Sequence, residues 1–288
     1  MSQAPTPDPA PVNLDELRRI AAAAARVGGD VARASFGSRL TVRLKVDRSE
    51  VTDVDLAAQR AIIDLIRGAR PDDAFLGEES TEHGDEAAAP DADRRTAGES
   101  TITWVIDPID GTRNYVRRIP LYVCSVAAMQ DGLPVAGAIY DPVRAVMYTA
   151  ARGAGAQAND EALCVSRQSI DDITLKPRKL IVAIPSIRRP RVRRLVQAAI
   201  DRHVIRNLGA TALHLAHVAE GAFDASISNN SRLWDIAAGV LLVEEAGGRI
   251  ASPFGEPLFP IDPIGCRGDE IPTLAAAPHA YEELLVAR

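Results

Sequence analysis

Apolar residues recur at helical spacing near the start of the chain. One such stripe runs from residue 14 to residue 36 behind Asn13, a residue type that suits a helix N-cap. A second covers residues 53–69 and follows Thr52, which can cap a helix in the same way. The polar, alternating run TVRLKVDRSE between them indicates a short hairpin or a mobile loop. We therefore expect two helices joined by a short connection.

The pattern changes to β-rich runs in the middle of the chain. Residues 80–100 are charged and carry no aliphatic side chain larger than alanine, so they are expected to form a surface loop. The runs TITWVID, YVCSVAAM, LPVAGAIYDP and AVMYTA follow, with turn signals at Asp131-Gly132 and Asp141-Pro142. This region predicts successive strands joined by turns.

Strands and helices alternate in the second half. The expected strands are KLIVAI, HVIRNLG and AFDASIS, and the expected helices are RRPRVRRLVQAAI, TALHLAHVAEG and LWDIAAGVLLVEEAGG. Alternation of this kind favours an α/β arrangement. We therefore expect three parts: a disordered N-terminal tail at 1–13, an α+β half at 14–150 and an α/β half at 151–288.

Composition narrows the classes of protein to consider. The 288 residues are 47% hydrophobic and 25% charged, and the net charge of −6 gives no general attraction to nucleic acid or membranes. The three cysteines form no CxxC pair, the first residues do not resemble a signal peptide, and no apolar run reaches membrane-spanning length. We expect a cytoplasmic protein that captures any anionic substrate locally, through a metal ion or a helix N-terminus.

Acidic residues stand at the ends of several predicted elements. They are Glu78 and Glu79 in GEES, Asp107 and Asp110 in WVIDPIDGT, Asp235 in LWDIAAG, and Asp53 and Asp55 in VTDVD. Taken singly, each has an ordinary explanation as a helix cap, a turn residue or a solvated side chain. Taken together, carboxylates from several loops are the hard oxygen ligands that Mg²⁺ requires. Two ions held in this way can activate water and stabilise a leaving oxygen.

The segment DPIDGT has the features of a turn that binds metal and phosphate. Pro108 restricts the chain between Asp107 and Asp110, so both carboxylates and the carbonyl of Ile109 can face one point. Gly111 allows close backbone approach, and the amides that follow can lie at a helix N-terminus that suits phosphate. The turn is therefore a candidate catalytic centre.

Two motifs carry a resemblance to a known family. WVIDPIDGTRNYV at 104–116 is similar to the W-x-x-D-P-x-D-G-T-x-N-[FY] pattern of the inositol monophosphatase family, and LWDIAAGVLLVEEAGG at 233–248 to its W-D-x-A-A-G…E-A-G-G pattern. VTDVD and FLGEES precede them at the expected places. The resemblance implies a Mg²⁺-dependent, lithium-sensitive phosphatase of the sugar phosphatase superfamily, a phosphoric monoester hydrolase. The implied fold is a layered αβαβα sandwich like that of fructose-1,6-bisphosphatase.

The resemblance also implies roles for individual residues. The residues that would hold two or three Mg²⁺ ions are Glu78, Asp107, the carbonyl of Ile109, Asp110 and Asp235, with Asp55 acting on a weaker third ion through water. Thr112 and Glu78 would orient the attacking water, and the amides of Gly111 and Thr112 would hold the phosphate. Catalysis would then be in-line attack of a metal-activated water on a small phosphorylated metabolite, without a phosphoenzyme. The same resemblance implies a homodimer.

The chain departs from the family pattern at the substrate end. Inositol-specific members commonly carry an acid seven residues before the aspartate of the W-D motif, whereas this chain has Ser228 there, followed by Asn230 and Arg232. These side chains suit another hydroxylated group or an anionic group. We expect a sugar-like or cyclitol phosphate as substrate, with histidinol phosphate, fructose 1,6-bisphosphate and 3′-phosphoadenosine 5′-phosphate as alternatives.

Other signals have plainer explanations. GAGAQA imitates a dinucleotide fingerprint without the helix and the later acid, so a glycine turn is the better interpretation and a nucleotide-dependent oxidoreductase only a third hypothesis. His214 and His217 lack further metal ligands nearby, and Cys124 lies in an apolar strand. The basic run RRPRVRR is expected to be a solvated helix face, and nucleic acid is not an expected partner. That run leaves open a second hypothesis, a non-catalytic regulatory or interaction protein on the same scaffold.

Overall fold

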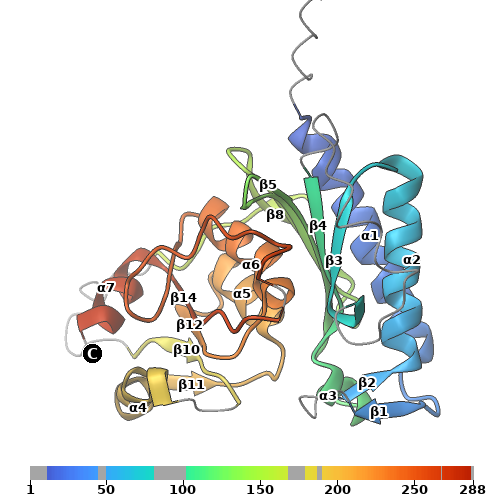
Figure 1. Cartoon of the computed structure of the whole chain (residues 1–288). Coiled ribbons are helices and arrows are strands. Elements are labelled where there is room, and N and C mark those ends of the chain that lie inside the picture. The colour runs from blue at the N-terminus through green and yellow to red at the C-terminus, as the bar shows by residue number, and fades with distance from the viewer. Residues whose placement is uncertain are drawn as a thin grey trace, which may run out of the picture.

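The computed structural model describes residues 12–44, 50–80, 102–167, 179–186, 190–266 and 268–286. Within them, helices and sheets alternate in layers, helix–sheet–helix–sheet–helix, from one side of the molecule to the other (Figure 1). The layers enclose separate apolar cores, one on each face of the larger sheet and one outside the smaller sheet. The layered αβαβα sandwich expected from the sequence is confirmed.

The larger sheet has seven strands in the order β3-β4-β5-β6-β7-β8-β9. β3 runs parallel to β4, and each later neighbour is antiparallel. The strands are β3 (Ala74–Gly77), β4 (Ile102–Asp110), β5 (Val123–Gln130), β6 (Leu133–Asp141), β7 (Val146–Ala151), β8 (Gly155–Ala158) and β9 (Glu161–Ala162). Asp131 and Gly132 take φ values of 51° and 78° between β5 and β6, as the predicted Asp-Gly turn requires.

Two long helices, α1 (Leu14–Ser35) and α2 (Asp53–Ala69), cover one face of this sheet. Asn13 and Thr52 are their N-caps, as predicted, and each accepts a hydrogen bond from a backbone N–H of the first helical turn. The apolar stripes of both helices face the sheet because only that side is removed from water. The two helices predicted from periodicity are therefore confirmed.

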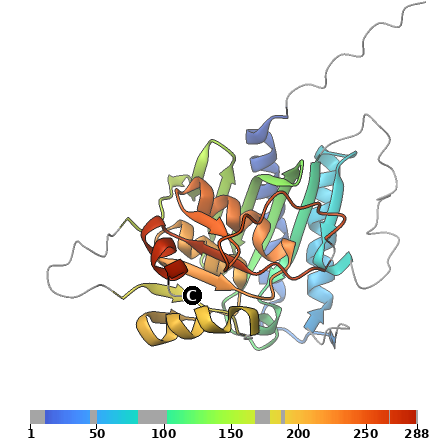
Figure 2. The same ribbon diagram turned by 60° about the vertical axis from the view of Figure 1, so that its left-hand side comes forward.

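The other face of the larger sheet packs on α5 (Thr211–Ala219) and α6 (Leu233–Glu245), which lie between the two sheets (Figure 1). The smaller sheet has the strand order β11-β10-β12-β14-β13. Its strands are β10 (Ile181–Ala183), β11 (Val204–Arg206), β12 (Ala225–Ser228), β13 (Arg249–Ala251) and β14 (Thr273–Ala276). Its outer face is covered by α4 (Arg193–Arg202) and α7 (Pro278–Val286), which Figure 2 brings forward.

The remaining elements are short and lie in the connections between the longer ones. They are β1 (Val42–Leu44), β2 (Glu50–Thr52), the 3₁₀ turns η1 (Glu78–Ser80) and η3 (Pro190–Val192), and α3 (Thr112–Val116). β1 and β2 pair antiparallel, which favours the hairpin over the mobile loop among the two expectations for this connection. The basic helix starts at Arg193, later than its sequence suggested, because the chain around Pro190 forms a 3₁₀ turn instead.

Three expectations lie partly or wholly outside these observations. Residues 1–11 of the tail expected at 1–13 and residues 81–100 of the loop expected at 80–100 are outside the described residues. The described ends belong to ordered elements, because Asn13 caps α1 and Ser80 ends η1. The division of the chain at residue 150 stays a prediction, and the larger sheet continues past that point to Ala162. None of the described helices is long and apolar enough to cross a membrane.

Candidate active site

The C-terminal end of β4 carries two of the predicted acids on an irregular stretch of strand. The β4–β5 register shifts between Asp107 and Asp110, so the strand bulges at the two residues between them. Pro108 has no N–H to offer the ladder and is tolerated at such a bulge. The N–H of Ile109 instead donates to Oδ1 of Asp107 at 3.0 Å. The bulge lets two nearby acids share one side of the strand end, which regular alternation would not achieve for residues three apart.

Asp235 completes a group of three carboxylates. It lies in the first turn of α6, and one carboxylate oxygen from each of Asp107, Asp110 and Asp235 lies within 4.8 Å of the others. Asp107 and Asp110 are buried and Asp235 is partly buried. The backbone N–H of Arg232 donates to Oδ2 of Asp235 at 2.7 Å and orients it. The structure therefore brings together acids that are more than a hundred residues apart in the sequence.

Asp110 also caps α5, one of the helices that lie between the two sheets. The backbone N–H groups of Thr211 and Ala212 donate to its Oδ1 and Oδ2 at 3.0 and 2.6 Å. Those amides open α5, whose N-cap residue Ala210 has no side chain able to accept them. A carboxylate at this position is favoured by the helix dipole. Asp110 therefore joins the larger sheet to the helices that lie between the sheets.

The electrostatics of this group favour a bound cation. Burial raises the pKa of Asp110 to about 7, with a further contribution from the charge of Glu78, even though the amides of α5 oppose the shift. Burial, then the charges of Asp110 and Glu78, raises the pKa of Asp235 well above its usual range. Like charges forced together in a poorly solvated site destabilise one another unless a cation neutralises them. The oxygen-only donor set therefore fits Mg²⁺.

Glu78 reaches the same region from the neighbouring strand. β3 pairs parallel to β4, with Gly77 opposite Ile106, so Glu78 follows its strand at the same edge at which Asp107 follows. The N–H of the next residue, Glu79, donates to Oε1 of Gln59 on α2 at 3.1 Å. Gln59 was not predicted from the sequence as part of the site. The sequence signal that could have identified it is a polar residue on the face of α2 that is otherwise apolar and buried.

Asp55 and Thr112 meet at one side of the carboxylate group. Thr52 and Asp55 form a capping box at the start of α2, with the Thr52 hydroxyl donating to Oδ2 of Asp55 at 2.5 Å. The Thr112 hydroxyl lies 3.0 Å from the carbonyl oxygen of Ile109 and 3.4 Å from Oδ1 of Asp55. Through these contacts the Thr112 hydroxyl lies between Asp55 and the β4 bulge.

Gly111 is required by the backbone at the start of α3. Its φ is 100°, in the left-handed region, and a Cβ there would lie 2.9 Å from the carbonyl oxygen of Leu121. The short helix begins at Thr112, as expected from the phosphate-binding turn. Asn114 anchors this segment by donating to the carbonyl oxygens of Leu121 and Leu208, each at 2.7 Å. The sequence motif includes Asn114, but no local pattern predicts that it anchors this segment.

The residues predicted at the substrate end lie on the connection between β12 and α6. Ser228 is buried, and its hydroxyl lies 2.5 Å from that of Ser231. Asn230 is partly exposed. The Arg232 guanidinium donates to the carbonyl oxygen of Gly268 and points toward that segment of the chain. These residues therefore lie near Asp235 in the chain, and their role with substrate stays a prediction.

The alternative signals have structural explanations. The His214 ring is buried, and its Nε2 accepts the N–H of Leu208 at 2.8 Å. His217 contacts Glu220 instead, so the two histidines are not turned toward one ion. The GAGAQA run forms a turn and β8, with β9 rather than a helix after it. Cys124 is buried in β5, as expected for a core residue.

Known proteins share both the sequence pattern and the fold. Residues 13–284 match the model of the inositol monophosphatase family. The chain is 36% identical over 269 residues to inositol-1-monophosphatase of Mycobacterium leprae, covering 90% of this chain and 84% of that protein. It is 35% identical over 243 residues to Nus factor SuhB of Pasteurella multocida, covering 82% and 85%. The crystal structure of the extragenic suppressor protein suhB from Bartonella henselae superposes with a TM-score of 0.77 at 29% identity, covering 94% and 98%. The chain belongs to the inositol monophosphatase family.

Proposed function

We propose that the protein is a Mg²⁺-dependent phosphomonoesterase that hydrolyses a small sugar-like or cyclitol phosphate. The observation that carries this proposal is the group formed by Asp107, Asp110 and Asp235, whose oxygens lie within 4.8 Å of one another. Such a group is costly to bury without a cation. Its position beside the α3 turn suits a reaction that neutralises and orients a phosphoryl group.

Each of the proposed ions would have its own set of ligands around the β4 bulge. Glu78, Asp107, the Ile109 carbonyl and Asp110 would hold one ion, and Asp107, Asp110 and Asp235 a second, with Asp55 near a weaker third. Bound Mg²⁺ would offset the negative charge of the phosphoryl oxygens and lower the pKa of water. The amides that donate to Asp110 and Asp235 leave each carboxylate with lone pairs for such contacts.

The protein groups around the ions would position the reactants. Thr112 and Glu78 would accept and orient the water that attacks phosphorus. The Thr112 hydroxyl lies 3.0 Å from the carbonyl oxygen of Ile109, and the charge of Glu78 contributes to the raised pKa of Asp110 and Asp235. The amides of Gly111 and Thr112 would donate to the phosphate, since the left-handed Gly111 turns the chain at that point. Holding water and phosphate in line lowers the barrier mainly by orientation.

The test is phosphate release in Mg²⁺ from inositol 1-phosphate, histidinol phosphate, fructose 1,6-bisphosphate and 3′-phosphoadenosine 5′-phosphate. We expect one ester to be preferred, EDTA to abolish release, and Asp107→Asn to reduce kcat at least about 10³-fold with the fold unchanged by circular dichroism. Asp64→Asn, an exposed position on α2, is the matched control and should keep parental activity. Near-normal kcat in Asp107→Asn would remove the metal assignment.

The departure at Ser228 bears on the choice of ester. A serine paired with Ser231 offers hydroxyl groups where a carboxylate would accept from a vicinal diol. We propose that Ser228, Asn230 and Arg232 contact the leaving group. Ser228→Ala and Arg232→Gln should change the ratio of kcat/KM between esters by about tenfold while the Mg²⁺ dependence stays parental. An equal loss on every ester would contradict this assignment.

A second candidate function is regulatory. Several relatives carry the name Nus factor SuhB, including the Pasteurella multocida protein. This candidate would gain support if the chain released no phosphate from any ester in the panel while it captured one specific partner. A homodimer and a cytoplasmic location stay predictions alongside both candidates.

A further inference from the structure

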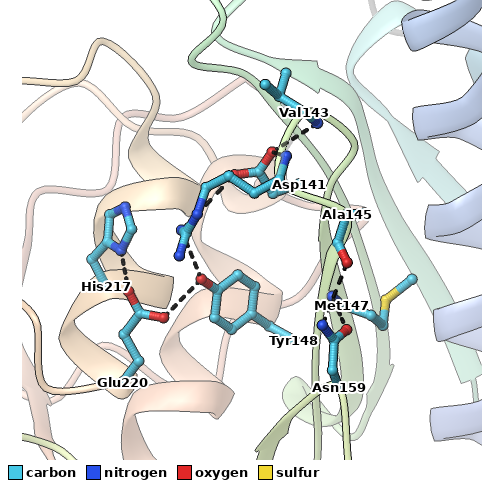
Figure 3. Close-up of polar contacts among 9 residues, drawn as sticks. Asp141, Val143, Ala145, Met147, Tyr148, Asn159, His217 and Glu220 are labelled. Atoms are coloured by element: carbon cyan, nitrogen blue, oxygen red, sulfur yellow. Dashed lines mark hydrogen bonds and ion pairs between the residues drawn. The ribbon is translucent and has the colours of Figure 1, made fainter.

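A second polar group lies on the same sheet, at the far end of α5 from the carboxylates. The Tyr148 hydroxyl on β7 donates to Oε2 of Glu220 at 2.8 Å, and Nδ1 of His217 lies 2.5 Å from Oε1 of the same carboxylate (Figure 3). His217 belongs to the last turn of α5, and Glu220 is its C-cap residue. We call His217, Glu220 and Tyr148 the brace. The brace ties the C-terminal end of α5 to a strand of the larger sheet.

The sheet side of the brace is itself fixed by a turn. The Asp141 carboxylate accepts the backbone N–H groups of Val143 and Arg144 at 2.9 and 3.0 Å. Nη1 of Arg144 then donates to the Tyr148 hydroxyl at 3.2 Å. Figure 3 shows Tyr148 between the β6–β7 turn and Glu220. The tyrosine hydroxyl is therefore held from both sides and has a single preferred direction.

The other end of α5 is the one bound to Asp110. The helix is nine residues long, so its ends are separated by about 13 Å. Its first amides donate to Asp110 on β4, and its last turn contacts Tyr148 on β7. Both contacts reach strands of the larger sheet, to which α5 has no direct chain connection. If the C-terminal end of so short a helix shifts, and the helix moves as one body, the amides at its other end tilt with it.

We propose that His217, Glu220 and Tyr148 are positioning residues that keep the N-terminus of α5 on Asp110 and so keep this carboxylate in its metal-binding orientation. The inference rests on the proposed function, in which Asp110 holds Mg²⁺. Groups behind a metal ligand fix its direction, and their loss weakens metal binding without removing a ligand. Glu220 is shared between a helix side chain and a strand side chain, so it is the central member of the brace.

The test compares two conservative changes in the same sheet. Tyr148→Phe removes the hydroxyl that contacts Glu220, whereas Tyr140→Phe removes a buried hydroxyl that accepts from Arg26 at 3.2 Å on the opposite face. Calorimetry on the metal-free proteins should show a weaker Mg²⁺ Kd in Tyr148→Phe, by up to about tenfold. Tenfold is the lower limit for groups that hydrogen-bond a metal ligand directly, and Tyr148 acts on Asp110 only through α5. The Thr211 and Ala212 amides should also exchange with solvent faster. Tyr140→Phe should match the parent in both measurements.

Glu220 supplies the matching loss and rescue. Glu220→Ala should show the same two effects. Glu220→Gln should have the parental Mg²⁺ Kd and the parental amide exchange, since an amide can still accept from Tyr148 and face His217. In phosphate release, kcat at saturating Mg²⁺ should stay within about threefold of the parent, while the Mg²⁺ concentration for half-maximal rate rises.

The inference is overturned if Tyr148→Phe and Glu220→Ala keep the parental Mg²⁺ Kd and the parental exchange of Thr211 and Ala212, even where their melting temperatures fall. These two readouts need no substrate. If the parent protein releases no phosphate but Tyr148→Phe binds Mg²⁺ more weakly than the parent, the proposed activity is wrong and the role of the brace stands. If the parent releases phosphate and the variants keep its Mg²⁺ affinity, the proposed activity stands and the role of the brace is wrong.

Discussion

At the scale of single residues, the carboxylates of the site are placed at a cost to the metal-free protein. Burial and the neighbouring charges raise the pKa of Asp235 well above its usual range, and burial raises that of Asp110 to about 7. Each shift means that the ionised form is less favourable in the folded state than in water. The unfavourable energy would be relieved by a cation, so the proposed metal site comes at the expense of stability without metal.

Asp235→Asn should therefore stabilise the metal-free protein. The substitution removes a carboxyl group whose ionised form the folded site disfavours, while an amide oxygen can still accept from the Arg232 N–H. We expect a gain of about 1–2 kcal/mol, or roughly 2–3 °C in melting temperature for a chain of this size. The same variant should lose most of the stabilisation that Mg²⁺ gives the parent. A lower melting temperature in EDTA would contradict the repulsion on which this prediction depends.

His214 predicts a second effect, in the pH dependence of stability. Burial, with a smaller contribution from His217, lowers the pKa of His214 to about 4. Between pH 4 and the value of about 6.5 expected in the unfolded chain, the unfolded state binds the extra proton. The stabilisation is thus complete above about pH 6.5 and is lost as the pH falls toward 4, by up to about 3 kcal/mol.

Urea unfolding at pH 7.5 and pH 5 measures this effect. His214→Gln keeps an acceptor for the Leu208 N–H but does not titrate. The variant should lose less unfolding free energy than the parent between the two pH values, although it is less stable at pH 7.5. Equal losses in the two proteins would show that His214 does not titrate as described.

At the scale of elements, close packing explains choices that helix propensity disfavours. α1 contains Gly28 and Gly29 in its interior, where glycine weakens a helix. A Cβ on Gly28 would lie 2.6 Å from Cδ1 of Ile62 and 2.8 Å from Sγ of Cys124. The missing side chains therefore let α1 approach α2 and β5 more closely than alanine would allow.

Alanine at two glycine positions should have opposite effects. Gly28→Ala should destabilise the protein by about 1–3 kcal/mol, because the buried neighbours must move. Gly68→Ala in α2 meets nothing within 4 Å and should stabilise by up to about 1 kcal/mol. Thermal unfolding of both variants checks the prediction, and a neutral Gly28→Ala would show that the contact between α1 and α2 yields easily.

The predictability of an element followed its environment. α1 and α2 could be predicted from the sequence because each buries one face and exposes the other to water, so apolar residues recur at helical spacing. α6 lies between two sheets and is buried on nearly all sides, so its sequence is apolar without a clear stripe. Its identity came from its motif and its closing glycines. The bulge in β4 had only Pro108 as a local signal.

At the scale of the whole molecule, the site lies where layers meet. Asp107 and Asp110 come from the larger sheet, Asp235 from α6 between the sheets, and the amides on Asp110 from α5. A bound ion would therefore link elements that belong to different layers. Binding at such a junction stabilises the packing of the layers as well as the local turn.

Mg²⁺ should therefore raise the melting temperature of the whole protein in one cooperative transition. At a free concentration of about 100 times Kd, the expected stabilisation is about 2.7 kcal/mol. EDTA should reverse it, and Asp107→Asn should show almost none. Scanning calorimetry measures the shift. Two separate transitions, only one of which responds to Mg²⁺, would mean that the ion does not link the layers.

The sequence by itself determined the order and type of most described elements, the acids of the site and the resemblance to the family. These properties depend on spacing within a few residues, where helix caps, turns and strand alternation are decided. Only the tertiary structure decided that Asp110 caps α5, that Ser228 pairs with Ser231 and that Tyr148 contacts Glu220. Asp110–Thr211 and Tyr148–Glu220 join residues far apart in the chain, so they exist only after the layers pack. The Ser228–Ser231 contact spans three residues but depends on the loop between β12 and α6, whose conformation no local pattern specifies.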